Sequence, residues 1–277
     1  MSDQGLSEHG MTVRRYDRDR FITALFAPPG PREDLFTLYA FNTEIARIRE
    51  TVSEPMLGQI RLQWWRDTLD CLCRGDHAGH PVADSLSGLI RRQSLPRPLF
   101  DRLIEARELD MQDTPPETMA QLQLYVEDSS AGLSALAALV LGGDDGATQE
   151  AARHVGQAWG LIGLLRAHAY TIKVRRLVLP VKEKRLDAEA ILAGETPPGL
   201  SDLAEQIAAL AAGHLASARK LRREISRAAI PALLPARLAD GYLARLKTAR
   251  FNLIDRSWSA INTRPLSLML ASSLGRF

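Results

Sequence analysis

The sequence predicts an all-α fold built as one large domain, and three observations support this. Apolar residues recur at helical spacing along most of the 277 residues, with prolines and glycines between the segments that carry the pattern. No segment alternates apolar and polar residues for long enough to build a sheet, and no repeat of fixed period is visible. With 45% hydrophobic and 25% charged residues, the chain can bury one sizeable core.

The first half of the chain predicts helices separated by clear breaks. Residues 1–15 are polar and are expected to form a disordered lead-in, so the domain is expected over residues 16–277. The run Pro28-Pro29-Gly30-Pro31 ends one helix, and acids in the first turn of the next suit the helix dipole. Ser53 is the expected N-cap of the third helix. The predicted helices cover residues 16–27, 32–50, 53–74, 82–93, 98–113 and 117–141.

The second half is organised around the stretch 155–180, which predicts a long helix that stops at Pro180. Small residues recur in it at Gly156, Ala158, Gly160 and Gly163. Glycine otherwise weakens a helix, so this composition predicts that a neighbouring helix packs closely against the stretch. Further helices are expected over residues 187–192, 200–228, 231–249 and 265–273.

The charge and hydropathy of the chain exclude some classes of function. A formal net charge of +2 and a pI near 8.6, with no dense basic stripe, argue against nucleic-acid binding. No apolar run reaches the roughly 18 to 20 residues that a membrane span needs, and the N-terminus lacks the apolar core of a signal peptide. We therefore expect a cytoplasmic protein and leave open a peripheral association with the inner membrane.

Two segments carry the motif frames of a known family. The stretch 155–180 keeps a frame of small, basic and terminal residues: Gly156, Ala158, Leu165, Arg166, Arg176, Leu179 and Pro180. An aromatic run, Tyr39-Ala40-Phe41, begins the other frame. In both respects the chain resembles the squalene and phytoene synthases, which join two prenyl diphosphates head to head. The resemblance spans about residues 16–270 and implies an isoprenoid synthase (trans-prenyltransferase) helical fold around a central cavity.

The acidic residues of both motifs are replaced. The first motif retains only Glu50 as an acid, while its aspartate pair reads Ala46-Arg47; in the second, the acidic positions read Ala167, Tyr170 and Thr171. In the family these acids hold the Mg²⁺ ions that neutralise the diphosphate leaving group. Mg²⁺ prefers oxygen ligands in octahedral geometry, which the replacements do not supply. We therefore expect no metal and no cofactor here.

Arginines near the expected cavity suggest a different use for it. A basic cavity without carboxylates can hold a lipid or prenyl phosphate directly through guanidinium groups; ordinary surface ion pairing is the alternative for Arg61 and Arg66. The candidate anion-binding residues are Arg47, Arg61, Arg66, Arg166 and Arg176. The residues that the resemblance places along the cavity are Tyr39, Phe41, Tyr125, Gly160 and Gly163.

Two functions of different classes follow from the resemblance. The chain is similar to the branch of the family that includes complex I assembly factor 6, which also lacks the aspartates. This implies a catalytically inactive protein acting in the assembly of respiratory complex I (NADH dehydrogenase), with complex I subunits as partners. The alternative is a divergent, Mg²⁺-dependent prenyltransferase of the squalene or phytoene type that recruits other acids.

Overall fold

The structure is a computed structural model that describes residues 5–74, 78–112, 114–260 and 265–277. The described residues form α-helices joined by short turns, with no strand among them. The predicted all-α fold is therefore confirmed. The helices of the first half are α1 (Glu8–Tyr16), α2 (Arg18–Ala24), α3 (Pro29–Thr51), α4 (Pro55–Arg74), α5 (Pro81–Gln93) and α6 (Arg97–Leu109).

The second half contains the central helix of the molecule and the helices on either side of it. These are α7 (Met119–Val126), α8 (Gly132–Val140), α9 (Gly146–Thr171), α10 (Ala188–Leu192), α11 (Leu200–Lys220), α12 (Ile230–Leu233), α13 (Pro235–Thr248) and α14 (Pro265–Ser273). Short segments of other helix types are η1 (Asp110–Gln112), the π-helix η2 (Glu127–Ala131), η3 (Ile172–Val174) and η4 (Arg227–Ala229).

The expected disordered lead-in is wrong for residues 8–15, because they belong to α1. Ser7 caps this helix by accepting a hydrogen bond from the backbone N–H of Gly10 at 3.0 Å. Val13 is fully buried, and α1 packs against α3. The Arg47 guanidinium also lies 3.7 Å from the centre of the Tyr16 ring. The Ser7 cap, the buried Val13 and the contact between Arg47 and Tyr16 thus hold a segment whose composition is mostly polar.

Several predicted boundaries shift because caps override the apolar pattern. The long helix α9 begins at Gly146, since Asp145 accepts hydrogen bonds from both the backbone N–H and the hydroxyl of Thr148. It ends at Thr171, and Arg175 then turns the chain with a left-handed φ of 53°. α4 begins after Glu54, whose carbonyl accepts from Gly58, and not after Ser53.

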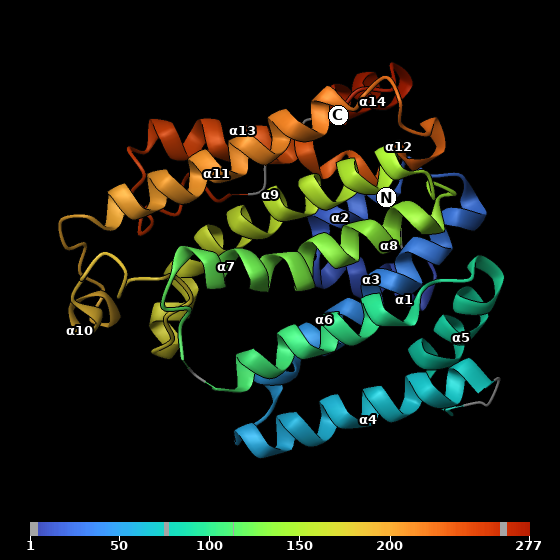
Figure 1. The fold of residues 1–277 in the computed structure, drawn as a ribbon, viewed down its shortest axis with the longest axis horizontal. Helices are drawn as coiled ribbons and strands as arrows, with labels where there is room; N and C mark the ends of the chain where they lie inside the picture. The colour runs from blue at the N-terminus through green and yellow to red at the C-terminus, as the bar shows by residue number, and fades with distance from the viewer. Residues whose placement is uncertain (1–4, 75–77, 113, 261–264) are drawn as a thin grey trace.

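α9 runs through the middle of the molecule, as Figure 1 shows, with α11 and α13 on one side and α7 and α8 on the other. Its contacts with α11, α8, η2 and α13 are extensive. α4 lies at the far edge of the molecule, where it packs on α5 and α6. Gly156 and Gly160 of α9 therefore have the close neighbours that the sequence predicts, whereas a Cβ on Gly163 would meet no atom within 4 Å.

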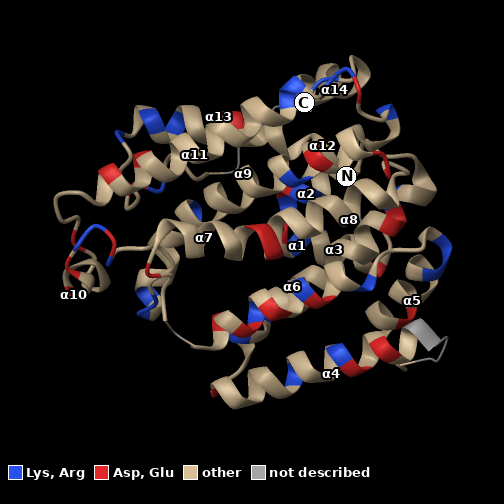
Figure 2. Cartoon of the chain, in the orientation of Figure 1, with Lys and Arg blue, Asp and Glu red and all other residues tan. Residues whose placement is uncertain are grey.

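The charged residues are spread over the helices and do not gather in one stripe (Figure 2). On α4 and α6, acidic and basic residues lie near each other along the same helix, whereas α8 carries neither. None of the helices in the described part of the chain has the length and hydropathy that crossing a membrane requires.

Candidate functional site

A cavity of about 220 Å³ lies between the helices that surround the middle of α9. It draws side chains from α2, α3, α6, α7, η2, α8 and α9, so it is assembled from both halves of the chain. Its walls combine basic, hydroxyl and apolar groups. The lining residues are Arg20, Asn42, Arg107, Tyr125, Val126, Ser129, Ser130, Leu133, Trp159, Gly160, Gly163 and Leu164.

One wall of this cavity is a cluster centred on Asp110, at the end of α6. Its carboxylate accepts hydrogen bonds from Arg176 at 2.8 Å and from the hydroxyl of Tyr125 at 3.2 Å, and Arg107 pairs with it at 3.3 Å. Arg107 also donates to the Tyr125 hydroxyl at 2.7 Å. Two arginines therefore share one carboxylate, which leaves the cluster with an excess of positive charge.

The ionisation of this cluster follows from its burial. Burial raises the pKa of Tyr125 to about 12, with Arg107 opposing the shift. Burial by itself would lower the pKa of Arg107, but Tyr125 and Asp110 outweigh it, so the pKa of Arg107 is raised. At neutral pH the wall consequently presents a neutral phenol and a guanidinium cation.

Arg20, which is only 9% exposed, also lines the cavity. One of its amino groups donates to Asp17 at 2.6 Å, and the other reaches the hydroxyl of Ser130 at 3.5 Å. Its guanidinium lies 6.0 Å from the centre of the Trp159 ring. Asn42, on α3, adds an amide whose Oδ1 is buried without a hydrogen-bond partner in the described structure.

A π-helical turn brings two hydroxyls to the cavity. η2 interrupts the helix predicted over residues 117–141 and places Ser129 and Ser130 in the cavity wall. π turns inside α-helices are frequently found at functional sites. α9 can approach this turn closely because Gly156 and Gly160 have no side chain: a Cβ on Gly156 would lie 2.7 Å from the Ser130 carbonyl, and one on Gly160 would lie 2.8 Å from the Ser130 Cβ.

The replaced residues of the first motif lie near the end of α3. Arg47 stands where the resemblance expects an aspartate, and it contacts the Tyr16 ring and Glu50, the latter at 3.9 Å. Ala46 is half-buried and Glu50 is exposed. Arg47 therefore stabilises the junction of α1 and α3.

The replaced residues of the second motif occupy the last two turns of α9. Ala167 is half-buried, Tyr170 is 50% exposed, and the hydroxyl of Thr171 donates to the carbonyl of His168 at 3.1 Å. Among the residues that the structure describes, no group of three or more His, Cys, Asp or Glu side chains is placed to hold a metal ion.

Each of the five arginines that were predicted to bind an anion contacts another group of the protein. Arg166 donates to Asp19 at 2.9 Å, Arg66 pairs with Glu108 at 3.0 Å, and Arg61 donates to Thr51 at 3.0 Å. Arg47 and Arg176 have the contacts described above. None of the five is among the described residues that line the cavity, where Arg20 and Arg107 stand instead. No motif in the sequence points to these two arginines.

Three of the five residues predicted to line the cavity do so: Tyr125, Gly160 and Gly163. Phe41 is instead fully buried against Trp65 and Phe100, with ring centres 5.0 and 5.6 Å away. Tyr39 lies behind Arg20, whose guanidinium is 5.8 Å from its ring. Asn42, the residue after Phe41, is the one that α3 contributes to the cavity lining.

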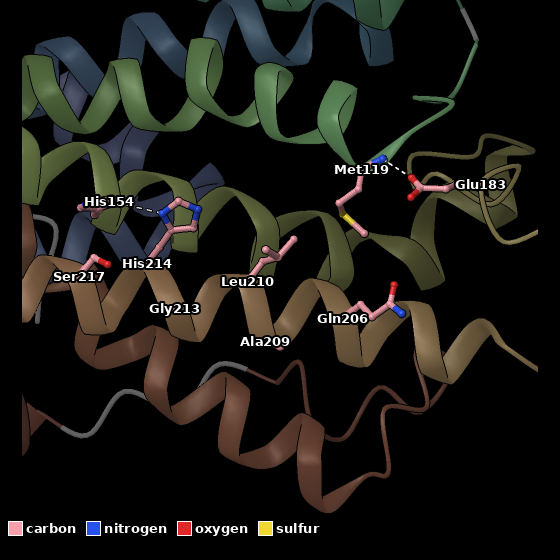
Figure 3. A pocket seen from close by; sticks show the side chains of 9 residues that line it. All are labelled: Met119, His154, Glu183, Gln206, Ala209, Leu210, Gly213, His214 and Ser217. Carbon is pink, nitrogen blue, oxygen red and sulfur yellow. Dashed lines mark hydrogen bonds between the residues drawn. The ribbon is translucent and has the colours of Figure 1, made fainter.

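A second, wider hollow of about 670 Å³ runs along α9 and α11 (Figure 3). Its most polar feature is a pair of histidines, His154 and His214, whose Nδ1 atoms are 3.0 Å apart. Glu183, at the other end, accepts from the backbone N–H of Met119. No arginine is among the described residues that line this hollow, whereas Arg20 and Arg107 line the smaller cavity. The smaller cavity is therefore the better candidate site.

The chain matches known proteins along nearly its whole length. The sequence model of the squalene/phytoene synthase family matches residues 13–265. The chain is 31% identical over 269 residues to complex I assembly factor 6 of Bos taurus, a match covering 96% of this chain and 81% of that protein. It is 30% identical to the Drosophila melanogaster homolog of the same factor, covering 98% and 84%.

The fold also matches solved structures. A dehydrosqualene synthase in complex with a ligand superposes with a TM-score of 0.81, covering 96% of this chain and 94% of that one, at 16% sequence identity. This likeness establishes the helical architecture of the chain.

Proposed function

The chain belongs to the squalene/phytoene synthase family, and we propose that it is a catalytically inactive member that acts in the assembly of respiratory NADH dehydrogenase (complex I). The observation that carries the proposal is the near full-length similarity, at about 30% identity, to proteins named as complex I assembly factor 6. We place the protein in the cytoplasm, in contact with complex I subunits or with the face of the inner membrane.

The residues at the two motif positions support an inactive protein. Ala46, Ala167 and Thr171 offer no carboxylate to a Mg²⁺ ion, and Arg47 would repel one. Carboxylates do lie close to the cavity, at Asp110 for example, but Asp110 is shared between two arginines. The alternative function, a divergent prenyltransferase, would have to recruit such acids away from their cations.

The surface of the protein supports a role in binding partners. Large apolar side chains are exposed on α4, where Met56, Ile60 and Trp64 follow one another at helical spacing with 67%, 59% and 41% exposure. Large patches of contiguous exposed apolar side chains mark sites that bind other proteins or membranes.

The assembly role is tested in the native host. Deleting the gene should lower the amount of assembled NADH dehydrogenase on native gels and the NADH:quinone oxidoreductase activity of membranes, and a plasmid copy should restore both. A deletion strain with unchanged assembled complex and unchanged activity contradicts the proposal.

Catalysis is tested with the purified protein. Incubation with farnesyl or geranylgeranyl diphosphate and Mg²⁺ should give no product above background, and the Ala46→Asp/Ala167→Asp double variant should not gain activity. Robust turnover that EDTA abolishes would establish the prenyltransferase alternative instead.

The proposal also assigns a ligand to the inherited cavity. We expect an acidic molecule, such as a lipid or prenyl phosphate, to be held by arginines without a bridging metal ion. Arg20 and Arg107 line the cavity and support this part of the proposal.

A further inference from the structure

We propose that α14 docks the protein on a membrane surface rich in anionic lipids, with exposed leucine and methionine side chains inserted below the headgroups and neighbouring arginines bound to them. The proposed function places the protein against complex I subunits or the inner membrane, and this inference rests on the membrane contact alone. Three features carry it: an uncovered apolar face, a set of unpaired basic side chains beside it, and a lack of groups that a protein partner would use.

α14 is apolar both on the face that it packs and on the face that it exposes. Leu268 and Ala271 are buried against the protein, at 1% and 5% exposure. Large apolar side chains follow one another at helical spacing on the other face, which Leu274 continues beyond the last turn. These side chains, all more than half exposed, are Leu266, Met269, Leu270 and Leu274. A helix that is apolar all round is normally covered on every side, and nothing in the described chain covers this outer face.

The end of α14 is fixed to the protein, so the outer face is held in position. Gly275 turns the chain with a φ of 61°, and the backbone N–H of Arg276 donates to the carbonyl of Ala271 at 2.7 Å. Phe277 is thereby buried, and its carbonyl accepts a hydrogen bond from the Nε of Arg219 at 3.0 Å. None of the extensive helix–helix contacts within the described ranges involves α14, which lies at the edge of the molecule (Figure 1).

Exposed basic side chains lie beside this end of α14. The Nε of Arg227 is 3.6 Å from where a Cβ on Gly275 would be. Figure 2 shows more basic residues at the end of α11 and in the turn after it, whereas α14 itself carries no charge. Segments 219–229 and 265–277 contain a single acid, Glu224. Their basic residues are Arg219, Lys220, Arg222, Arg223, Arg227 and Arg276.

Most of these cations have no carboxylate partner. Arg219 pairs with Asp240 at 2.6 Å. The side chains of the other basic residues make neither an ion pair nor a hydrogen bond with any residue that the structure describes. The resulting excess of positive charge complements an anionic surface, and each Lys or Arg held near a membrane adds to its attraction to anionic lipids.

The chemistry of the outer face favours lipid over a protein partner. Protein interfaces are enriched in aromatic side chains and contain hydrogen bonds across their area. The exposed residues of α14 include no aromatic side chain, and the hydroxyl of the one exposed serine, Ser273, already donates to the carbonyl of Leu270 at 3.1 Å. Aliphatic side chains flanked by unpaired cations are instead typical of helices that lie in the interface of anionic membranes.

Vesicle flotation of the purified full chain tests the inference with two lipid compositions. One is phosphatidylcholine alone, and the other is equal parts of phosphatidylcholine and phosphatidylglycerol. The protein should partition at least tenfold more strongly onto the anionic vesicles, and added salt should weaken this binding because it screens the arginines. No binding to the anionic vesicles, or equal binding to both compositions, overturns the proposal.

A double substitution on the outer face tests whether α14 makes the contact. Leu266→Ser/Leu270→Ser should reduce partitioning onto the anionic vesicles at least fivefold, and a thermal melt should show an unchanged fold because the two side chains are 73% and 63% exposed. Met56→Ser/Leu124→Ser is the matched control, since these side chains of α4 and α7 are 67% and 64% exposed. Wild-type partitioning of the α14 variant, or an equal loss in both variants, contradicts the proposal.

A second variant removes charge and leaves the apolar face intact. Arg222→Gln/Arg223→Gln should weaken binding to the anionic vesicles at least fivefold, and unchanged binding overturns the role of the basic side chains. Sedimentation velocity tests a second copy of the chain as the occupant: a dimer that Leu266→Ser/Leu270→Ser dissociates would make the outer face an interface between copies and overturn the proposal.

The membrane contact and the assembly role can fail separately. Vesicle binding through α14 together with unchanged complex I in the deletion strain would refute the assembly role alone. Loss of complex I in the deletion strain together with no vesicle binding would refute the membrane contact alone.

Discussion

Gly156 and Gly163 lie about two turns apart on α9, yet the space around them differs completely. A Cβ on Gly156 would lie 2.5 Å from the Ala131 Cα and 2.7 Å from the Ser130 carbonyl, whereas one on Gly163 would meet nothing within 4 Å. The first glycine allows two helices to touch, and the second borders the cavity. Glycine in the same helix therefore allows close helix packing at one position and borders a cavity at the other.

The arginines around α9 differ in the same way. Arg166 belongs to a closed network: it donates to Asp19 at 2.9 Å, and the Tyr242 hydroxyl donates to the same carboxylate oxygen at 2.9 Å. Arg107 belongs to the cavity wall and keeps an unpaired Nε. The network around Arg166 holds α2, α9 and α13 together, while Arg107 joins α6 to Asp110 and to Tyr125 on α7. Perturbing the closed network should therefore affect stability most.

The largest expected effect is on the closed network. In Arg166→Ala, Asp19 loses its cation while it is only 5% exposed, so the free energy of unfolding should fall by about 3–5 kcal/mol. Urea unfolding followed by circular dichroism measures this. Arg61→Ala, which removes an exposed contact with Thr51, is the control and should change stability by no more than about 0.5 kcal/mol.

A second substitution separates burial of charge from loss of packing. Adding Asp19→Asn to Arg166→Ala removes the uncompensated carboxylate, so the double variant should be more stable than Arg166→Ala alone. If Arg166→Ala is as mild as Arg61→Ala, the Asp19 network does not hold the three helices together.

The next effect depends on pH and concerns His168, a buried residue of α9. This residue is 1% exposed, and both of its ring nitrogens lack a partner in the described structure. Burial lowers the pKa of His168 from 6.5 to about 4. Between these values the unfolded chain binds more protons than the folded one, so the contribution of His168 to stability is complete above pH 6.5 and is lost as the pH falls towards 4.

Each unit of pKa shift corresponds to about 1.36 kcal/mol, so the shift of the His168 pKa should change the free energy of unfolding by about 3 kcal/mol. Unfolding free energies measured from pH 7 to pH 4 should therefore fall less steeply in His168→Leu than in the wild type. Carboxylates titrate in both proteins, so the difference between the two curves isolates the histidine. Parallel curves would mean that His168 can be protonated without unfolding.

A smaller loss is expected from Gly156→Ala. Alanine is the better helix former, but its Cβ would press on the backbone of η2, which cannot rotate away as a side chain can. Such overpacking costs about 1–3 kcal/mol. The midpoint of thermal unfolding should fall accordingly. An unchanged midpoint would show that η2 can move away from α9, and the contrast between the two glycines would then lose its basis.

The fold was predictable because its signals are local. Helical spacing and proline breaks fixed the number and order of the long helices, and the small residues of α9 indicated close packing. Boundaries shifted where single side chains decide them, as with the Asp145 cap that begins α9. α11 ends at Lys220 and not near residue 228, with no proline or glycine to mark the end. Periodicity does not reveal the π turn of η2 either, because the apolar pattern of α7 and α8 continues on both sides of it.

The candidate site was less predictable because it is assembled from distant segments. The family resemblance pointed to Tyr125, Gly160 and Gly163, which are among the residues that line the cavity. Arg20 and Arg107 lie on α2 and α6 outside both frames, and only the tertiary arrangement brings them to one space. The arginines within the frames attracted attention by their charge, but a sequence does not show that acids such as Asp19 and Asp110 already occupy them.

The smallest expected effect has the opposite sign. Gly163→Ala adds a methyl group to an unobstructed helical position, so the gain in helix propensity should raise the free energy of unfolding by about 0.5–1 kcal/mol. Urea unfolding beside Gly156→Ala measures both variants under one condition, and the two substitutions should move stability in opposite directions. Loss of stability in both would mean that the wall at Gly163 is as tightly packed as the contact at Gly156. A gain at Gly163 alone shows that this position of α9 can tolerate a side chain, and that the glycine there keeps the cavity open at a cost in stability.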